Sequence, residues 1–479
     1  MPPSAHATTN SRGRFVLIWA ILGAAVVSGQ ALGAGLATPW RQVWEEFDRT
    51  YSYFSHKKVD WDKVWIEHQA DFDAITTPND FAEKLNDILQ VLRDWHVTVR
   101  KPDGKVIGYR AEVVPNYHPT KVVFARYADG PPYENLKNAG AIVHGWVSSN
   151  IAHVVVLTLS ARFSESITEQ DIDNLFAKYR SAQGMILDLR ANGGGNENHA
   201  KLIAERFTDE PRIYGYVRSR IPGPDRNAFT DFVPKTLVPS SRTRFKGNVV
   251  CLVGQRTISS AEAFALMIRA LPQGTLVGDV TRGASGNPVE REVPELNVRY
   301  TLSTWMAFDD QKHPLENVGI SPRIRIPATA SYDEERDYVL ETAIALIRGG
   351  SSSTLGIPDS WVLQHRLNLT ETSDADGDGL IDRHEYAAGT DPTDPRSTFR
   401  VLSLRRSDAS PGWTVRWSSV AGKRYALRKA SNIAAASPFD VVVQRNVLGT
   451  GAETSFTDSA SAVMGPGPWF YRVELEEEP

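Results

Sequence analysis

One stretch of the chain combines a strand, a sharp turn and a helix, and its turn carries serines. The apolar run from Val249 to Val253 has the length and β-branched content of a buried strand, and small and apolar residues follow at helical spacing from Ser260 onward. A serine in the turn, Ser259 or Ser260, would stand at a helix N-terminus, where unpaired N–H groups favour a developing negative charge. Such a serine is a candidate nucleophile. On this stretch alone, a helix cap is the favoured interpretation, because serine is a usual N-cap residue.

A second apolar strand, at residues 185–189, leads into three consecutive glycines, Gly193 to Gly195, ahead of a further helical segment. Glycine-rich turns of this kind can point backbone N–H groups at an anion. The turn lacks the Lys-Ser or Lys-Thr pair of a P-loop and the glycine spacing of a dinucleotide site. Nucleotide binding is therefore the weaker interpretation.

Two further residues could take part in proton transfer. His96 follows a long predicted helix and lies two positions after Asp94 in the sequence. Glu316 lies between a predicted strand and a turn. Histidine has a pKa near neutrality and can accept a proton from a serine hydroxyl. Considered alone, His96 would be a structural or solvated side chain, and Glu316 a solvated one.

The elements that must position these residues follow from the hydrophobic periodicity. Helical spacing predominates over residues 39–93, and Thr77 with Pro78 marks the start of the last helix there. Residues 97–326 mix strands and helices, which favours an α/β core layered by helices. A helix is also predicted at about 333–348, before a serine-rich linker. The predicted strands cover residues 154–159, 185–189, 249–253, 275–280 and 298–305.

In their order and spacing, these motifs resemble peptidase family S41, the tail-specific or C-terminal processing proteases. The tricorn-type branch is more similar than the processing-protease branch. The resemblance covers roughly residues 40–347. The motifs that carry it are Val59–Trp61, Leu92–His96, 187–195, Thr257–Glu262, 278–283 and Glu316–Pro322.

The resemblance implies a serine-type peptidase that forms an acyl-enzyme and needs no cofactor for catalysis. Ser259 matches the family nucleophile, His96 the general base, and Glu316 the acid that orients the histidine. The resemblance also implies a ClpP/crotonase-like ββα core. The expected oxyanion donors are the backbone amides of Gly193, Gly194 and Ser260.

Two positions depart from the family pattern. Ala284 stands where the processing proteases have a catalytic lysine, which excludes a Ser-Lys dyad at that place. Trp95 replaces the second serine of the tricorn-type tetrad. The segment between His96 and Val154 is too short for a PDZ domain, so selection of substrates by a PDZ-bound C-terminus is not expected.

Residues 373–385 carry acids at alternating positions, as an EF-hand loop does. Three aspartates occupy its positions one, three and five, and Gly379 supplies the turn at position six. The sequence therefore predicts a structural Ca²⁺ site, and residues 386–395 resemble the end of a thrombospondin type 3-like calcium repeat. The expected ligands are Asp374, Asp376, Asp378, the carbonyl of Leu380, Asp382 and Glu385.

The N-terminus has the pattern of a secretory signal peptide. Arg12 and Arg14 precede an apolar run from Phe15 to Val27, and small residues follow up to Ala34. We expect a secreted or periplasmic protein with no stable membrane span after signal removal, with an uncleaved anchor as the alternative. The net charge of −4 gives no basic excess, so a nucleic-acid partner is not expected.

The single cysteine, Cys251, excludes an intramolecular disulfide and is expected to be a small buried hydrophobe. The final stretch alternates apolar and polar residues between turns, which is typical of a small β-sandwich. The expected division is a signal peptide (1–34), a helical N-terminal subdomain (35–96), a peptidase core (97–350), a linker with the calcium loop (351–397) and a C-terminal β-sandwich (398–479).

The function expected from these observations is a secreted serine endopeptidase acting on peptide or protein substrates. A non-catalytic ligand- or peptide-binding protein on the same core is the main alternative, and labelling by a serine-reactive phosphonate would separate the two. An adhesion or matrix protein with an inactive core is a third hypothesis. Under any of them, the C-terminal domain is a candidate for binding a cell surface or another protein.

Overall fold

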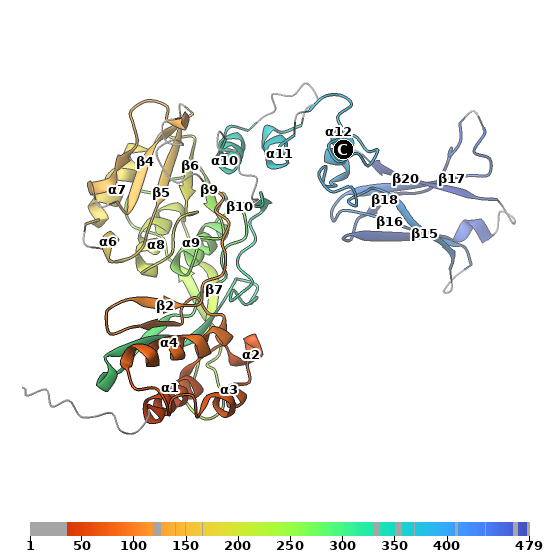
Figure 1. Cartoon of the computed structure of the whole chain (residues 1–479). Helices are drawn as coiled ribbons and strands as arrows, with labels where there is room; N and C mark the ends of the chain where they lie inside the picture. Colours follow the sequence, from red (N-terminus) through yellow and green to blue (C-terminus); the bar gives the residue numbers. More distant parts are fainter. Residues whose placement is uncertain are drawn as a thin grey trace, which may run out of the picture.

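The computed structural model describes residues 36–117, 126–138, 140–148, 150–164, 166–328, 336–349, 357–367, 369–407, 411–435, 437–462 and 468–476. The chain forms an N-terminal unit, a central α/β body and a C-terminal β domain that stands to one side (Figure 1). The expected signal peptide, residues 1–34, lies outside the described residues. Among the helices of the described part, none has both the length and the apolar character needed to cross a bilayer.

The N-terminal unit is a set of helices that share an aromatic core. These are α1 (Ala37–Thr50), α2 (Phe54–Lys57), α3 (Trp61–His68) and α4 (Pro78–Leu89), with a 3-10 turn at Gln90–Leu92. The predicted start of α4 is confirmed, since the Thr77 side chain accepts from the Asp80 amide and Pro78 is the first helical residue. The core of this unit contains fully buried rings of Trp40, Phe47, Trp61 and Phe81.

A four-stranded antiparallel sheet completes the N-terminal unit, in the order β11-β12-β1-β2. Strands β1 (Thr98–Arg100) and β2 (Val106–Gly108) directly follow the helices, but β11 (Pro288–Val293) and β12 (Val298–Ser303) come from much later in the chain. Residues of this late hairpin, such as Val298 and Leu302, pack in the same core as the helices. The N-terminal unit is therefore built from two segments, one before and one after the candidate nucleophile.

The central body is organised around a seven-stranded sheet in the order β14-β10-β9-β6-β5-β4-β3. The five strands from β14 to β5 run parallel, and β4 and β3 pair antiparallel at the edge. The strands are β3 (Glu134–Asn135), β4 (Ile142–Val147), β5 (Ile151–Val156), β6 (Gly184–Asp188), β9 (Asn248–Val253), β10 (Gly274–Gly278) and β14 (Ile324–Arg325).

Helices cover both faces of this sheet, as the alternation of strands and helices predicts. One face packs against α7 (Glu169–Lys178), α8 (Glu197–Ala204) and α9 (Ser260–Arg269), with the short α6 (Ala161–Ser164) near the edge, and the other against α10 (Tyr338–Arg348) (Figure 1). Cys251 is fully buried in β9, so its expected place in the core is confirmed.

One predicted strand, residues 298–305, is in fact two. Strand β12 ends at Ser303, and β13 (Trp305–Phe308) begins after Thr304 in a separate sheet with β7 (Arg212–Ser219) and β8 (Val233–Leu237). The amides of Thr304 and Trp305 both donate to the Gly286 carbonyl, at 2.9 and 3.3 Å. This bend moves the chain from the N-terminal unit back to the central body, which a continuous apolar pattern does not reveal.

The C-terminal part contains α11 (Asp359–Gln364), α12 (Asp382–Ala388) and two three-stranded antiparallel sheets. Side chains from both sheets, Trp417 and Tyr425 among them, form one apolar cluster between them. A buried ion pair between Lys429 and Asp458 also links the sheets, at 2.7 Å. The strands are β15 (Val401–Arg406), β16 (Trp413–Ser418), β17 (Arg424–Ala430), β18 (Val441–Leu448), β19 (Glu453–Asp458) and β20 (Phe470–Glu476).

Candidate active site

Ser259 lies in the turn between β9 and α9, at the carboxyl edge of the parallel strands. Its backbone has φ 59° and ψ −123°, a left-handed φ that a residue with a side chain adopts only at a cost of about 1–3 kcal/mol. An ordinary N-cap residue has extended dihedrals instead. Ser259 is thus the N-cap residue of α9, as the sequence suggested. Its backbone, however, has a strained conformation of the kind that is common at functional sites.

Glu262 holds this strained turn in place. Its fully buried carboxylate accepts hydrogen bonds from the amide of Ser259 (3.1 Å), the hydroxyl of Thr281 (2.6 Å) and the amides of Gly283 (2.7 Å) and Ala284 (2.9 Å). Burial raises the pKa of Glu262 to about 7, against the effect of these donors. The sequence offered a signal for this role, since an acid three positions after a cap serine forms a capping box.

The glycine turn after β6 lies directly against Ser259. A Cβ added to Gly194, which has φ +92°, would come within 2.9 Å of the Ser259 Cβ and 3.0 Å of the Ser260 amide nitrogen. The Ile258 amide donates to the Asn192 carbonyl (3.1 Å), and the Ser260 hydroxyl donates to the Gly195 carbonyl (2.6 Å). Two turns that are distant in sequence are therefore brought together, as neighbouring parallel strands require.

The three expected oxyanion donors differ in their availability. The Gly194 amide already donates to Asn192 Oδ1 at 2.8 Å. The amides of Gly193 and Ser260 donate to no acceptor in the described part of the chain. Gly193 and Ser260 are thus the two amides that remain free for a substrate oxygen.

His96 lies in the turn before β1, with the ring almost buried. Its amide donates to Asp94 Oδ1 (2.8 Å), and its carbonyl accepts from the Thr301 hydroxyl (2.6 Å), so its backbone is fixed. Burial lowers the pKa of His96 below its usual value, which favours the neutral imidazole that a general base needs. Within the described residues, its ring forms no hydrogen bond with Ser259 or Glu316, and Asp94 Oδ1 lies 4.0 Å from its Nδ1.

Glu316 is paired with a lysine rather than with His96. Its carboxylate receives a hydrogen bond from Lys57 Nζ at 2.5 Å and another from the Ser285 amide at 3.3 Å. Burial, together with the nearby Asp94 carboxylate, raises the pKa of Glu316 above its usual range. The acid that the resemblance assigns to the histidine is therefore engaged with α2 in this structure.

Lys57 and Asp94 are functional candidates that sequence reasoning missed. Lys57 Nζ lies 3.9 Å from Asp94 Oδ2, and the same oxygen accepts from the hydroxyls of Tyr51 (2.9 Å) and Ser303 (3.0 Å). Lys57, Asp94 and Glu316 thus form one buried cluster of a cation and two carboxylates. No motif marks Lys57, which lies in a helix of four residues.

A cavity of about 620 Å³ opens beside this cluster, between α2 and the turns that follow β10 and β13. Glu316, Thr281 and Arg282 line it on the side of the central body, and His56 and Lys58 on the side of the N-terminal unit. The Arg282 amide donates to the Thr257 carbonyl at 3.1 Å, two residues before Ser259. The cavity therefore borders the turn that carries the candidate nucleophile.

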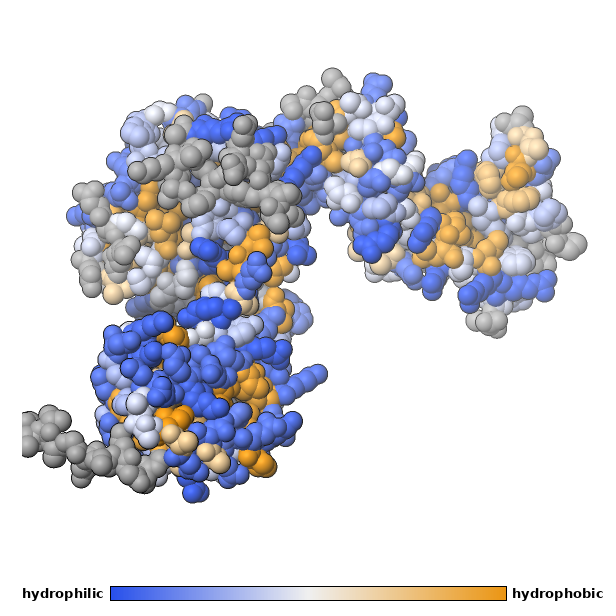
Figure 2. Space-filling model, in the orientation of Figure 1, coloured by the Kyte–Doolittle hydropathy of each residue, from blue (hydrophilic) through white to orange (hydrophobic). Residues whose placement is uncertain are grey.

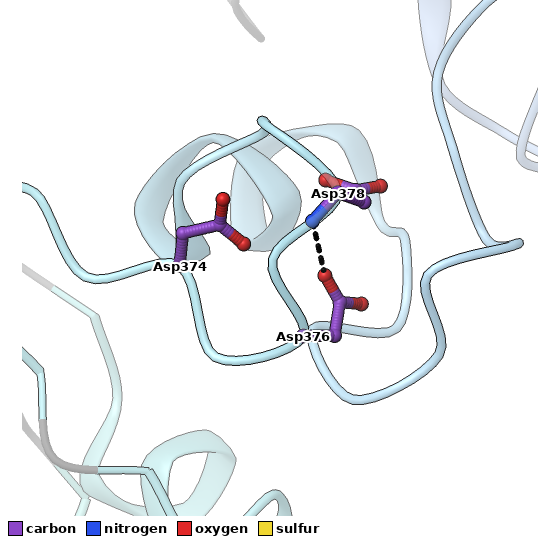
Figure 3. A group of neighbouring side chains, drawn as sticks. All are labelled: Asp374, Asp376 and Asp378. Atoms are coloured by element: carbon purple, nitrogen blue, oxygen red, sulfur yellow. Dashed lines mark hydrogen bonds between the residues drawn. The ribbon is translucent and has the colours of Figure 1, made fainter.

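The acidic loop forms a separate site before α12. One carboxylate oxygen from each of Asp374, Asp376 and Asp378 lies within 4.8 Å of the others (Figure 3). Asp382 and Glu385 follow in α12 and are buried. An oxygen of each of Asp376, Asp378 and Glu385 is buried with no hydrogen-bond partner in the described residues, which suits a hard cation with oxygen ligands.

Leu380, whose carbonyl is also expected as a ligand, donates a hydrogen bond from its amide to Asp378 Oδ1 at 2.7 Å. Burial, with the neighbouring aspartates, raises the pKa of Glu385 to about 7. A cluster of carboxylates that resists ionisation in this way would gain from a bound cation.

Comparisons with known proteins show what the central body is similar to. Residues 151–326 match the model of peptidase family S41. The chain is 24% identical over 178 residues to the carboxy-terminal processing protease CtpA of Bacillus subtilis (strain 168), covering 37% of this chain and 35% of that protein. It is 27% identical over 180 residues to the tricorn protease of Thermoplasma acidophilum, covering 36% of this chain and 15% of that protein.

A crystal structure of a peptidase-like protein from Parabacteroides merdae ATCC 43184 extends the likeness beyond the matched segment. It has 27% sequence identity and a TM-score of 0.58, and the alignment covers 66% of this chain and 98% of that one. The chain spans about a third of the length of CtpA and about a seventh of tricorn protease. By its matched segment and this structural likeness, the central body is similar to peptidase family S41.

Proposed function

We propose that the protein is a secreted serine endopeptidase that hydrolyses peptide bonds of protein substrates through Ser259, His96 and Glu316. The observation that carries the proposal is the strained turn of Ser259, fixed by Glu262 and placed against the glycine turn. Secretion rests on the signal-peptide pattern of residues 1–34. The core is then the ClpP/crotonase-like ββα unit that the family resemblance implies.

In this mechanism the Ser259 hydroxyl attacks the carbonyl carbon of the scissile bond while its proton moves to His96. The amides of Gly193 and Ser260 bind the oxygen that becomes negative, a contribution of about 3 kcal/mol for each donor. His96 then returns the proton to the leaving amine, and the acyl-enzyme forms. Water, deprotonated by His96, hydrolyses the ester and restores the serine. Catalytic hydrogen bonds are often long before a substrate binds and tighten with it, so His96 is expected to close on Ser259 in the complex.

Glu316 and Asp94 stabilise the imidazolium that forms on His96 by their negative charge. Asp94 lies nearer to the ring, at 4.0 Å from Nδ1. The direct contact with Lys57 lowers the pKa of Glu316 against the larger effect of burial, and the same cation opposes protonation of His96. The ion pair between Lys57 and Glu316 therefore affects how readily His96 accepts a proton.

The experiment is hydrolysis of fluorescein-labelled casein by the full chain and its Ser259→Ala and His96→Ala variants. Each substitution should lower the rate by roughly 10⁴-fold. A fluorophosphonate should label the wild type at Ser259, identified by mass spectrometry. Ser181→Ala and His68→Ala, which change exposed or half-exposed residues away from the site, serve as matched controls. Wild-type rates in both Ser259→Ala and His96→Ala would disprove the mechanism.

A non-catalytic peptide-binding protein on the same core is the second candidate. It is favoured by Trp95 at the place of the second serine and by a His96 ring that makes no hydrogen bond with Ser259. Under this hypothesis, peptides bind but casein is not cleaved and the phosphonate does not react. The labelling experiment therefore separates the two functions.

We also propose a structural Ca²⁺ in the thrombospondin type 3-like loop, bound by Asp374, Asp376, Asp378, the Leu380 carbonyl, Asp382 and Glu385. The unpartnered buried oxygens of Asp376, Asp378 and Glu385 support it. Ca²⁺ should protect the joint between the core and the C-terminal domain from trypsin, and EGTA should remove the protection. Asp376→Asn should lose the effect, whereas Asp394→Asn, in the following exposed turn, should keep it. Equal cleavage with Ca²⁺ and with EGTA would refute the site.

A further inference from the structure

The cavity beside Glu316 contains more positive than negative charge. Its lining includes five lysines and arginines but only two acids, Asp279 and Glu316. Each acid is already paired with one of the lining cations: Arg325 Nε lies 3.2 Å from Asp279 Oδ1, and Lys57 Nζ lies 2.5 Å from Glu316 Oε1. Two cations are thus neutralised within the cavity wall.

Three cations remain without a carboxylate partner. Within the described residues, no acidic oxygen lies within 4 Å of the charged groups of Lys58, Arg93 or Arg282. Asp279 is not available to them, because its oxygens also accept from the Gln255 side chain (3.1 Å) and from the amides of Val280 (2.8 Å) and Ala328 (3.1 Å). The cavity therefore has an uncompensated positive charge that would favour an anion.

Arg282 is held in position by Trp95. Its guanidinium lies 4.8 Å from the centroid of the indole ring, and Arg110 lies over the same ring at 5.2 Å. Arginine that is oriented by stacking keeps its planar fork free to bind a carboxylate with two hydrogen bonds. The residue that departs from the family pattern, Trp95, thus serves as a platform for one of the three free cations.

The cavity also lies beside the segment that supports the candidate nucleophile. Arg282 directly precedes Gly283 and Ala284, whose amides are bound by Glu262, and the Ser259 amide donates to the Ala284 carbonyl at 2.9 Å. A ligand in the cavity would therefore touch the segment that supports the nucleophile. The chain as a whole carries a net charge of −4, so the positive charge here is local.

We infer that this cavity is a specificity subsite that binds a carboxylate of the substrate peptide through Arg93, Arg282 and Lys58. The inference rests on the proposed peptidase function and adds the substrate class, a peptide with a carboxylate close to the scissile bond. That carboxylate comes either from an Asp or Glu side chain or from a free C-terminus. Both present the same group to a guanidinium, and the experiment below distinguishes them.

The test uses three fluorescein-labelled twelve-residue peptides of one sequence. The first has two central Glu residues and an amidated C-terminus, the second has Gln in their place and a free C-terminus, and the third has Gln and an amide. Binding to the Ser259→Ala full chain is measured by fluorescence anisotropy, so the result does not depend on cleavage. Cleavage by the wild type is followed separately by mass spectrometry.

We expect the third peptide to bind about tenfold or more weakly than at least one of the other two, the value for one lost charge-assisted contact. Preference for the first peptide identifies a side-chain carboxylate, and preference for the second identifies the C-terminus. In Arg93→Gln/Arg282→Gln, in the Ser259→Ala background, the preference should disappear while the affinity for the third peptide is unchanged. Arg323→Gln, an exposed arginine outside the cavity, should keep the preference.

Equal affinity of the Ser259→Ala chain for all three peptides, or a preference that survives in the Arg93→Gln/Arg282→Gln variant with a normal melting temperature, would overturn the inference. Failure of the proposed function looks different. In that case the wild type cleaves none of the peptides and does not react with the fluorophosphonate, while the carboxylate preference in binding persists.

Discussion

Lys57 and Glu316, separated by 259 positions in the sequence, form a buried ion pair with 2.5 Å between Nζ and Oε1. Their side chains are at most 1% exposed. The pair joins the second helix of the N-terminal unit to the turn after β13. Two further contacts reinforce this junction: the Tyr53 hydroxyl donates to the Ser285 carbonyl at 2.6 Å, and His56 Nε2 lies 2.9 Å from the Glu316 carbonyl oxygen. The candidate site is thus shared by two units of the fold.

Lys57→Met should destabilise the protein by about 3–5 kcal/mol, because it leaves the Glu316 and Asp94 carboxylates buried without a cation. Urea unfolding followed by tryptophan fluorescence measures the change. Lys58→Met replaces the exposed neighbour and should change the stability by no more than about 0.5 kcal/mol. If the two variants unfold at the same urea concentration, the buried ion pair does not contribute to stability as proposed.

Glu262→Gln should both destabilise the fold and slow the labelling of Ser259. The carboxylate accepts two hydrogen bonds on each oxygen, and an amide nitrogen at either place would face N–H or O–H donors. Each buried donor left unsatisfied costs about 1–3 kcal/mol. Thermal unfolding and the rate of fluorophosphonate labelling measure the two effects. Glu295→Gln, at an exposed position, is the matched control and should behave as wild type.

Gly194→Ala should abolish activity and lower the stability, but the protein should still fold. The added methyl group would meet the Ile258 carbonyl oxygen at 2.7 Å and the Ser259 Cβ at 2.9 Å, at a φ of +92° that alanine adopts poorly. Gly193→Ala, whose added Cβ has no atom within 4 Å, is the paired comparison. Casein hydrolysis and melting temperature are measured for both, and a fully active Gly194→Ala would show that the two turns do not need this contact.

The acid limb of the pH profile of kcat/KM should have its midpoint below pH 6.5. Burial lowers the pKa of His96 from the model-peptide value of 6.5, so the neutral base persists to lower pH. The Arg110 charge contributes in the same direction, and Arg110→Gln should therefore move the limb to higher pH. A midpoint above 6.5 in the wild type would contradict His96 as a buried base.

The same shift affects stability. The unfolded chain binds a proton at this histidine near pH 6.5, whereas the folded chain does so only at lower pH, so the unfolded state gains protons first as the pH falls. The contribution of His96 to stability is thus complete above pH 6.5 and is lost as the pH falls towards the folded pKa. Urea midpoints of the wild type and His96→Gln should converge over this range.

Much of the fold follows from local patterns. The hydrophobic run of β9, the small and apolar residues of α9 and the cap at Thr77 each specify their element within a few residues, and the structure confirms them. The meeting of the Ser259 turn with Gly194 is also predictable, because adjacent parallel strands end at one edge. The partner of Glu316 is not predictable in this way. Lys57 lies in a four-residue helix with no period, and only the tertiary fold brings it to an acid 259 positions away.

The late hairpin β11–β12 explains a second difference between pattern and structure. Its alternating residues are typical of a strand pair, but nothing local indicates that it packs on helices near the N-terminus rather than on the central sheet. The prediction of one strand at 298–305 was wrong at Thr304 for the same reason. The residues before Thr304 pair with β11, and those after it pair with β7. Predicting the assignment of strands to sheets needs the long-range contacts that a single sequence does not contain.

The placement of that hairpin also sets an order of assembly during synthesis. A ribosome releases the chain from its N-terminus, and domains that are contiguous in sequence can fold as they emerge. The N-terminal unit lacks half of its sheet until residue 303 has been made, because β11 and β12 follow Ser259 in the chain. The complete N-terminal unit around His96 and the cavity beside Glu316 therefore cannot form before residue 303 has been made. A nascent chain that already contains Ser259 therefore still lacks the two strands that complete the unit around His96. Under the proposed mechanism, hydrolytic activity arises only when both units have formed.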